Sequence, residues 1–392
     1  MSLSHLDERL SLNDTLGRFL AHRYDIDTRQ KIARNPQGYS LNRWQSFADL
    51  GAIAALLPPA HGGTGGSAHD ITQVFDALGR ALVLEPFLPT AVLAASALAH
   101  AGTADQQSLL ADVLDGTLIM SLAHQEDAGA QATTPRPGPV HTEAVREGAH
   151  WVLQGHKVLV PLGHQSELLV VSARTAGEPD DAHGVSLFVL PLDTPGVRVR
   201  PHALPDGSRV ADVTLQGAVL PDHALLGPLH QGTSTLMHAL NRGVLAWCAE
   251  ALGVMEVLQA QTAAHLQTRQ QFGASRHADP TWAWLASVPS AAMQHALAQA
   301  RSALEQATAA LDDDDDPAAC EWALAHAQRT VGRVAAQVVQ DCVELHGGPN
   351  RVAQLPLAHH VHRLMVIQRQ LGQGDHPMTR LLPQGTGDTI AP

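Results

Sequence analysis

The feature that most limits the fold is a series of long alanine- and glutamine-rich stretches in the C-terminal part of the chain. Alanine and glutamine are good helix formers, and the links between the stretches are short. Four helices are predicted, at Thr233–Gln270, Thr281–Leu311, Pro317–His346 and Leu355–Leu371. Long helices joined by short links pack antiparallel to their neighbours. The chain is therefore predicted to end in a four-helix bundle.

The middle of the chain has a different character, which begins at about Ile119. Short runs rich in β-forming residues, such as Val185 to Leu190 and Val210 to Leu215, alternate with turn formers such as Asp206-Gly207. Short strands punctuated by turns are typical of a small all-β unit, so a barrel or sandwich is predicted.

The residues before this β unit predict helices. Trp44, Phe47, Leu50 and Ile53 recur at helical spacing, and Pro58-Pro59 with the glycines from 62 to 66 are expected to end that helix. Asp70 is predicted to begin the next helix, where its carboxylate lies near the positive end. The fold class is therefore α+β, with an N-terminal α domain (1–118), a middle β domain (119–228) and a C-terminal helical domain (229–392).

Length, charge and hydropathy exclude several classes of function. With 392 residues the chain exceeds one ordinary core. Its formal net charge of −13 argues against nucleic acid as a partner, because phosphate binding needs concentrated lysine and arginine. The first residues lack the apolar run of a signal peptide, and no stretch is expected to be long and uncharged enough to span a membrane. Three cysteines without a CxxC pair predict buried thiols in a reducing cytoplasm: Cys248, Cys320 and Cys342.

Two clusters invite comparison with metal sites. The run from Asp312 to Asp316 lacks the ligand spacing of a calcium site and predicts a solvated loop between helices. His359 and His362 lie one helical turn apart, but no other ligand group accompanies them, so a polar helix face is the preferred interpretation. No metal site is predicted.

Several short motifs occur in a fixed order along the chain. Arg269-Gln270-Gln271-Phe272-Gly273 closes the first bundle helix, and Glu344-Leu345-His346-Gly347-Gly348 lies near the end of the third. An earlier series runs from Leu50-Gly51 to Leu78-Gly79-Arg80. In order and spacing these motifs resemble those of the acyl-CoA dehydrogenase family, and the resemblance covers nearly the whole chain.

The resemblance implies a reaction and a shared site. In the family, a carboxylate takes the α-proton of an acyl-CoA, FAD accepts hydride from the β-carbon, and an electron-transfer flavoprotein is the usual acceptor. FAD lies between subunits, held by the β domain of one and clasped by the bundle of its neighbour. The residues of this chain that correspond to the clasp are Arg269, Phe272, Gly347 and Gly348. Arginine offers paired donors to a pyrophosphate, and glycine lets backbone approach the cofactor closely.

The residues that correspond to the flavin-holding half depart from the family pattern. Gln125 and Gln131 stand where the family has hydroxyl side chains; both can donate hydrogen bonds but are longer. Leu159 replaces a tryptophan, and Pro161 has neither a hydroxyl nor a backbone donor. These changes predict that the chain does not hold flavin in its own β domain.

The catalytic carboxylate is missing from its usual place. Gln373 stands there, and an amide cannot accept the α-proton. The alternative family position corresponds to Gly243, flanked by Arg242 and Val244. Asp375 is the only nearby acid, and two residues of extended chain place its side chain on the same side as that of Gln373, so a relocated base is conceivable.

Three interpretations follow from these residues. The preferred one is the small, degenerate subunit of a two-component acyl-CoA dehydrogenase of the pimeloyl-CoA or steroid-degradation type, which completes the FAD site of a homologous partner in a hetero-oligomer. The second is a self-sufficient homo-oligomeric enzyme that uses Asp375. The third is a non-catalytic structural or regulatory protein on this fold, because fold alone does not fix function.

Overall fold

The computed structural model describes residues 3–126, 138–181, 183–268, 270–271, 274–275, 280–313 and 316–372. Its N-terminal part is helical. In chain order the helices are α1 (Leu3–Arg23), α2 (Ile26–Arg34), α3 (Leu41–Asp49), α4 (Ala68–Ala81), a π-helix η3 (Phe87–Ala94), α5 (Ala95–Ala101) and α6 (Ala104–Leu114), with short 3-10 turns η1 (Ala54–Leu56) and η2 (Pro59–His61).

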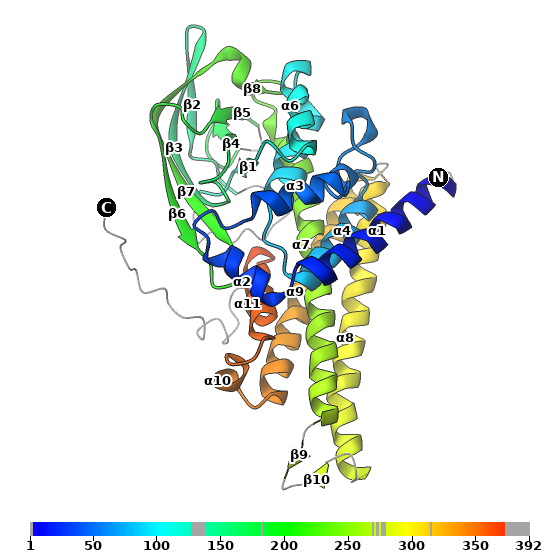
Figure 1. Cartoon of the computed structure of the whole chain (residues 1–392). Coiled ribbons are helices and arrows are strands. Elements are labelled where there is room, and N and C mark those ends of the chain that lie inside the picture. Colours follow the sequence, from blue (N-terminus) through cyan, green and yellow to red (C-terminus); the bar gives the residue numbers. More distant parts are fainter. Residues whose placement is uncertain are drawn as a thin grey trace.

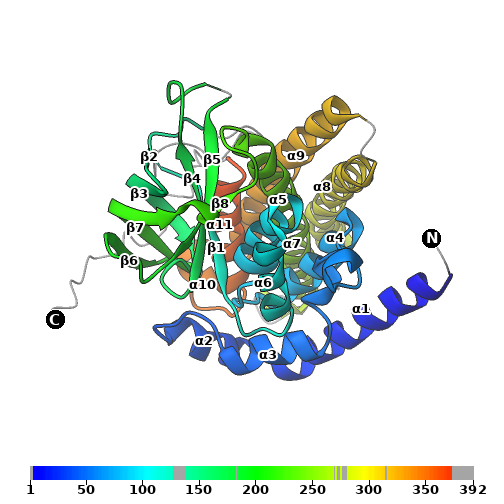
Figure 2. The same ribbon diagram turned by 90° about the horizontal axis from the view of Figure 1, so that it is seen from above.

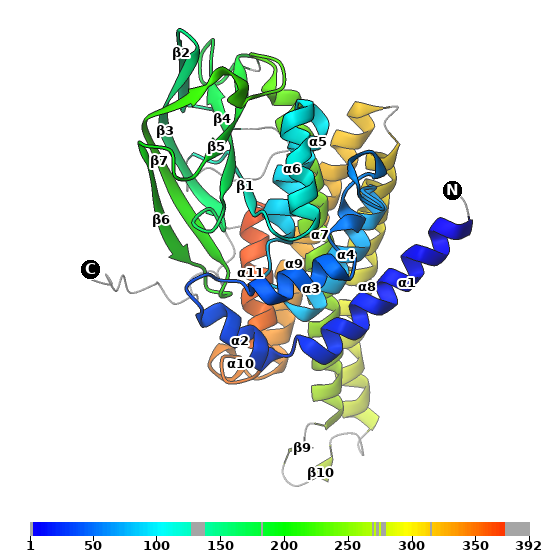
Figure 3. The same cartoon turned by 45° about the horizontal axis from the view of Figure 1, so that its top comes forward.

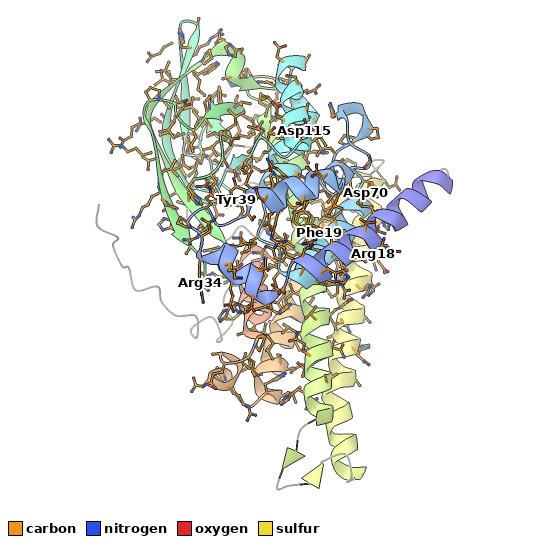
Figure 4. The ribbon with its side chains drawn as sticks, in the orientation of Figure 1. Arg18, Phe19, Arg34, Tyr39, Asp70 and Asp115 are labelled. Atoms are coloured by element: carbon orange, nitrogen blue, oxygen red, sulfur yellow. The ribbon has the colours of Figure 1, made fainter. Side chains whose placement is uncertain are left out.

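The helix predicted to begin at Asp70 begins two residues earlier. Ser67 is its N-cap: the Ser67 hydroxyl accepts from the Asp70 backbone N–H, and the Asp70 carboxylate accepts from the Ser67 N–H. Asp70 is labelled in Figure 4. This reciprocal capping satisfies two donors that a helix start leaves unpaired. The preceding helix was predicted too long, because α3 ends at Asp49 and Gly51 takes a φ of +77°.

The middle part is an eight-stranded mixed sheet (Figure 1). Its order is β6-β7-β3-β2-β4-β5-β8, and β1 pairs in parallel with β4. The strands are β1 (Met120–Ala123), β2 (Glu143–Glu147), β3 (His150–Pro161), β4 (Leu168–Arg174), β5 (Val185–Pro191), β6 (Val197–Ala203), β7 (Arg209–Pro221) and β8 (Leu225–Leu226), with a 3-10 turn η4 (Asp222–Ala224) before β8.

The C-terminal part is built on one long helix. It comprises α7 (Gly232–Thr268), α8 (Pro280–Asp312), α9 (Pro317–Leu345), α10 (Pro349–Val352) and α11 (Ala358–Gln370), with the two-residue strands β9 (Gln270–Gln271) and β10 (Ala274–Ser275) between α7 and α8. Seen from above, the sheet lies on one side and α8 on the other, and α1, α2 and α3 run along a third side (Figure 2). The chain thus has the predicted helix, sheet and helix architecture.

Two glycines bring α7 against α4. A Cβ on Gly79 would lie 2.3 Å from the backbone oxygen of Glu250, and one on Gly253 would lie 2.3 Å from that of Asp76. The close crossing therefore requires residues without side chains. The expectation that no stretch is long and apolar enough to cross a membrane is wrong for α7, which passes that test by length and composition over Gly232–Leu266. Its apolar window is 72% buried inside the protein, as in the core helix of a bundle.

A buried ion-pair network joins the three parts. Arg363 of α11 donates to both carboxylate oxygens of Glu250 on α7, at 2.6 and 2.8 Å, and to Asp206 in the β6–β7 turn at 2.8 Å. Burial acts to lower the pKa of Arg363, but the two carboxylates outweigh it and raise that pKa. Arg29 of α2 reaches the same turn by donating to the Asp206 carbonyl. The network holds the sheet in place against the helices.

The acidic run and the histidine cluster have structural partners. Asp312 accepts from the Ala68 N–H at 2.6 Å and so caps α4, while Asp316 is the N-cap of α9. His359 and His362, which were predicted to lie on a polar helix face, are both half-buried, and the neighbouring His360 is buried. His360 is buried against the Arg80 carbonyl, and His359 contacts Gln30 of α2, because α11 packs on the N-terminal helices.

Candidate functional site

The predicted site residues divide by whether the structure describes them. Gln125, Gly347 and Gly348 are described. The predictions for five others fall outside the described residues and stay predictions: Arg269, Phe272, Gln131, Gln373 and Asp375.

The glycine pair forms an open turn at the end of α9. The N–H groups of Gly347 and Gly348 donate to the carbonyls of Glu344 and Val343, at 3.1 and 2.8 Å. Their φ angles are +95° and +103°, which side-chain-bearing residues rarely adopt. A Cβ on Gly348 would have nothing within 4 Å. The turn therefore needs glycine for its backbone and leaves that backbone approachable from outside.

The loop that carries Gln125 is held by the protein itself. The Gln125 carbonyl accepts from the Val158 N–H of β3 at 2.7 Å. Beside it, the fully buried Lys157 donates to Glu126 at 2.6 Å, to the Ser172 hydroxyl at 3.1 Å and to the His124 carbonyl at 3.3 Å. These contacts use all three donors of the ammonium group. Sequence reasoning did not single out Lys157; a lone lysine within a β-rich run was the available signal.

Burial and the ion pair act against each other at this cluster. Burial lowers the pKa of Lys157 to about 8, although the Glu126 carboxylate opposes that change. The pKa of Glu126 is lowered, because Lys157 and the hydrogen bonds outweigh the effect of its burial. Burial, aided by Lys157, lowers the pKa of His124 to about 3. At neutral pH the cluster is thus a cation, an anion and a neutral imidazole, with the charges balanced inside the chain.

The end of β3 offers few donors. A bulge places Val158 and Leu159 opposite the single residue Asp212 of β7, and Leu159 takes a φ of +54°. The Leu159 N–H donates to the Asp212 carboxylate at 3.3 Å. Pro161 has no N–H, and its carbonyl accepts from the Ser121 hydroxyl at 2.6 Å. This segment therefore presents neither a hydroxyl nor an unpaired backbone N–H at Leu159 or Pro161.

A cavity of about 80 Å³ lies where the N-terminal helices, the sheet and α11 meet. Ligand pockets for small molecules are commonly on the order of 300–1,000 Å³, so this one is small. Its lining includes Glu85, Leu88, Leu162, Arg209, Trp247 and Ile367.

Glu85 is the carboxylic acid among the residues that line this cavity, and sequence reasoning missed it. One of its oxygens accepts from the Tyr24 hydroxyl at 2.8 Å, and that hydroxyl accepts from the Leu84 N–H at 2.9 Å. Burial raises the pKa of Glu85 to about 7, although Tyr24 opposes the change. The carboxyl group therefore titrates much closer to neutral pH than an exposed glutamate does.

The first bundle helix supplies no acid at the alternative position. A Cβ on Gly243 would lie 2.6 Å from Cδ2 of Leu93 in the π-helix, so the space there is filled. Arg242 is buried and donates to the Ser96 hydroxyl and to the Gly66 carbonyl, each at 2.9 Å. Its role is structural, since it ties α7 to the glycine-rich turn before α4.

Comparison with protein families then identifies the chain. Three domain models of one family match it in order: the acyl-CoA dehydrogenase N-terminal domain at residues 7–117, the middle domain at 125–216 and the C-terminal domain at 230–375. The chain belongs to the acyl-CoA dehydrogenase family.

Individual acyl-CoA dehydrogenases agree. Acyl-CoA dehydrogenase FadE12 of Mycobacterium tuberculosis is 26% identical over 361 residues, which cover 87% of this chain and 86% of that protein. A solved Tcur3481-Tcur3483 steroid ACAD variant has a TM-score of 0.80 at 25% identity and covers 96% of this chain and 97% of its own. The ChsE4-ChsE5 complex from Mycobacterium tuberculosis has a TM-score of 0.78 at 24% identity, with 95% and 93% covered.

Flavin-dependent dehydrogenation of acyl-CoA is the reaction of this family, so the two halves of the acyl-CoA dehydrogenase site can be tested for their fit to FAD. In the part of the β domain that the structure describes, the residues fit FAD poorly: Lys157 fixes the loop at Gln125, Pro161 lacks a donor, and the adjoining cavity measures about 80 Å³. The glycine turn does fit, because Gly348 leaves open space on its outer side.

Proposed function

We propose that this chain is a subunit of an FAD-dependent acyl-CoA dehydrogenase that introduces an α,β double bond into an acyl-CoA thioester, and that it completes the FAD site of a partner subunit. The observation that carries the proposal is the contrast between the two half-sites. The flavin-facing part of the sheet is closed by its own hydrogen bonds, whereas the turn at Gly347 and Gly348 is open to another molecule.

The work of this chain is then binding and orientation. The backbone at Gly347 and Gly348 would meet the cofactor held by the partner, and Arg269, the next residue after α7, would balance its phosphate charge. FAD, when bound, supplies the hydride-accepting chemistry. The α-proton would pass to a carboxylate of the partner subunit, since Gln373 cannot accept it.

Two further points support this assembly. The solved ChsE4-ChsE5 structure is a complex of two differently named chains. The segments from Leu78 to Pro86 and from Gly207 to Leu215 resemble the small subunit of pimeloyl-CoA-type dehydrogenases. An electron-transfer flavoprotein is the proposed electron acceptor and the cytoplasm the proposed location.

The proposal is tested by co-expression. The chain alone should show no stoichiometric flavin band in its visible spectrum after desalting. Co-expression with an acyl-CoA dehydrogenase from an adjacent reading frame should give a copurifying, yellow complex that oxidises acyl-CoA. The same partner expressed without this chain should hold less FAD.

Other outcomes would decide for the alternatives. A stoichiometric flavin band in the chain alone would replace the proposal with a self-sufficient enzyme, for which Asp375 is the candidate base. A complex without flavin, or the absence of any complex, would favour a structural or regulatory protein.

A further inference from the structure

Two histidines stack where α7 and α9 end. The rings of His265 on α7 and His346 at the C-cap of α9 have centroids 4.3 Å apart and planes 23° from parallel. His346 is only 2% exposed, and its Nδ1 lies 2.8 Å from the Cys342 carbonyl. A carbonyl can only accept, so Nδ1 carries the proton and the ring orientation is fixed.

The stack rests on a buried layer between the two helices. Leu258 and Thr262 of α7 and Cys342 of α9 are each at most 1% exposed. Burial raises the pKa of the Cys342 thiol to about 11, so this layer stays uncharged at neutral pH. The His346 ring is thus held by its burial beside this layer and by its hydrogen bond to the Cys342 carbonyl.

The stack links the two segments that the proposed function assigns to the partner's FAD. His346 directly precedes Gly347, and His265 lies one turn before the end of α7 at Thr268, after which Arg269 follows. The far ends of α7 and α8 project beyond the rest of the molecule (Figures 1 and 3). A projecting helix end needs a lateral contact to hold its position relative to a turn on another helix.

We propose that His265 and His346 are a positioning pair, which fixes the end of α7 relative to the Gly347–Gly348 turn and thereby sets the affinity of the shared site for FAD. This inference rests on the proposed function. The pair touches neither substrate nor cofactor in this assignment; it acts through the two segments that do.

The chain contains a matched control for simple packing. His100 of α5 and His238 of α7 also stack, with centroids 4.5 Å apart and planes 18° from parallel. This second stack lies near the other end of α7. If stacked histidines merely add stability, removing His238 and removing His265 should have the same consequences.

The test uses the complex of this chain with its flavin-holding partner, and FAD is the probe. The apo complex is titrated with FAD by flavin fluorescence for the wild type and for His265→Ala, His265→Phe and His238→Ala, and the melting temperature of each is recorded. His265 is chosen because it is more exposed than His346, so that its variants fold.

His265→Ala should raise the Kd for FAD roughly three- to tenfold, the range that one aromatic pair spans. His265→Phe keeps a ring in the stack and should stay within about twofold of wild type. His238→Ala should leave the Kd unchanged while it lowers the melting temperature about as much as His265→Ala does.

An unchanged Kd in His265→Ala, a failure of His265→Phe to restore binding, or an equal effect of His238→Ala would each overturn the positioning pair and leave the proposed function standing. A wild-type complex that fails to bind FAD would overturn the proposed function, and the pair with it.

Discussion

The loop at His124 to Glu126 and the turn at Gly347–Gly348, which the proposed function assigns to the two halves of an FAD site, are built in different ways. In the loop, a buried lysine places all its donors on groups of its own chain. In the turn, the outer side of Gly348 meets nothing within 4 Å. Both segments satisfy their own hydrogen bonds, but only the turn leaves open space beside its backbone. Under the proposed function, a chain can therefore lose the flavin-holding half of the site and keep the half that meets a partner's cofactor.

The largest effect on stability is expected from removing the lysine that holds the loop at His124 to Glu126. Lys157→Met leaves the Glu126 carboxylate without its cation, which should lower the free energy of unfolding by about 3–5 kcal/mol. Urea unfolding followed by tryptophan fluorescence measures this loss. Lys31→Met, on the exposed side of α2, is the control. A loss no greater than that of the control would show that the loop is held by other contacts.

The next effect concerns the affinity of the complex for FAD, which should fall when the positive charge of Arg269 is removed. In the complex, Arg269→Ala should weaken FAD binding by on the order of 2–4 kcal/mol, because charge-assisted hydrogen bonds to phosphate are removed. FAD titration of the apo complex measures the change, and Arg18→Ala on α1 serves as the surface control. Unchanged affinity would place Arg269 outside the cofactor site.

Glu85, which lines the small cavity, should make the stability of the fold depend on pH. Its pKa is about 7 in the folded chain and near 4.5 when unfolded, so the folded state binds the proton more tightly. Stability from this group is therefore full below about pH 4.5 and is lost as the pH rises through about 7, by roughly 3 kcal/mol in total. Unfolding of wild type and Glu85→Gln is compared from about pH 5 to about pH 8.

The variant should lose this part of the pH dependence, whereas Glu305→Gln on the exposed side of α8 should retain it. Parallel pH curves for wild type and Glu85→Gln would mean that Glu85 is ionised in the folded chain.

A smaller effect is expected at the glycine turn. Gly348→Ala forces a side chain into φ +103° and should cost about 1–2 kcal/mol of stability. Gly148→Ala, between β2 and β3, is the matched control, since its φ is +63° and it too has nothing within 4 Å. Gly348→Ala should lower the melting temperature at least as much as Gly148→Ala, because φ +103° with ψ 171° is a conformation that only glycine adopts readily, and Gly348→Ala alone should weaken FAD binding in the complex. Equal FAD affinity in the two variants would remove Gly348 from the clasp.

The smallest effect is expected at the degenerate base position. Gln373→Ala and Asp375→Asn should each leave turnover of the complex nearly unchanged, because the proposed function assigns the carboxylate to the partner. A relocated base would instead show a loss of roughly 100-fold or more in Asp375→Asn with FAD still bound. Steady-state turnover with acyl-CoA, together with the flavin spectrum of each variant, decides between these outcomes.

Much of the architecture was accessible from the sequence. The four bundle helices predicted at Thr233–Gln270, Thr281–Leu311, Pro317–His346 and Leu355–Leu371 differ by at most three residues at either end from α7, α8, α9 and α11. The short strands β1, β2 and β8 were missed, because four, five and two residues carry too little pattern to be recognised.

The sequence by itself determined those features that depend on the chemistry of a single residue. Gly347 and Gly348 could be assigned to a tight, open turn because glycine alone tolerates that backbone, and Pro161 could be excluded as a donor because proline has no N–H. The motifs also sufficed to suggest the family, since their order is a property of the chain.

Only the tertiary structure decided which distant residues meet. Lys157 with Glu126, Glu85 with Tyr24, and His265 with His346 are separated by 31, 61 and 81 positions, and no local pattern pairs them. The protonation and the role of each side chain depend on its burial and on the residue that it contacts. Both are determined when the sheet and the helices pack together. The sequence therefore predicted which family groups the site lacks, and the packing determined which distant side chains meet, because burial and pairing arise only when the sheet and helices come together.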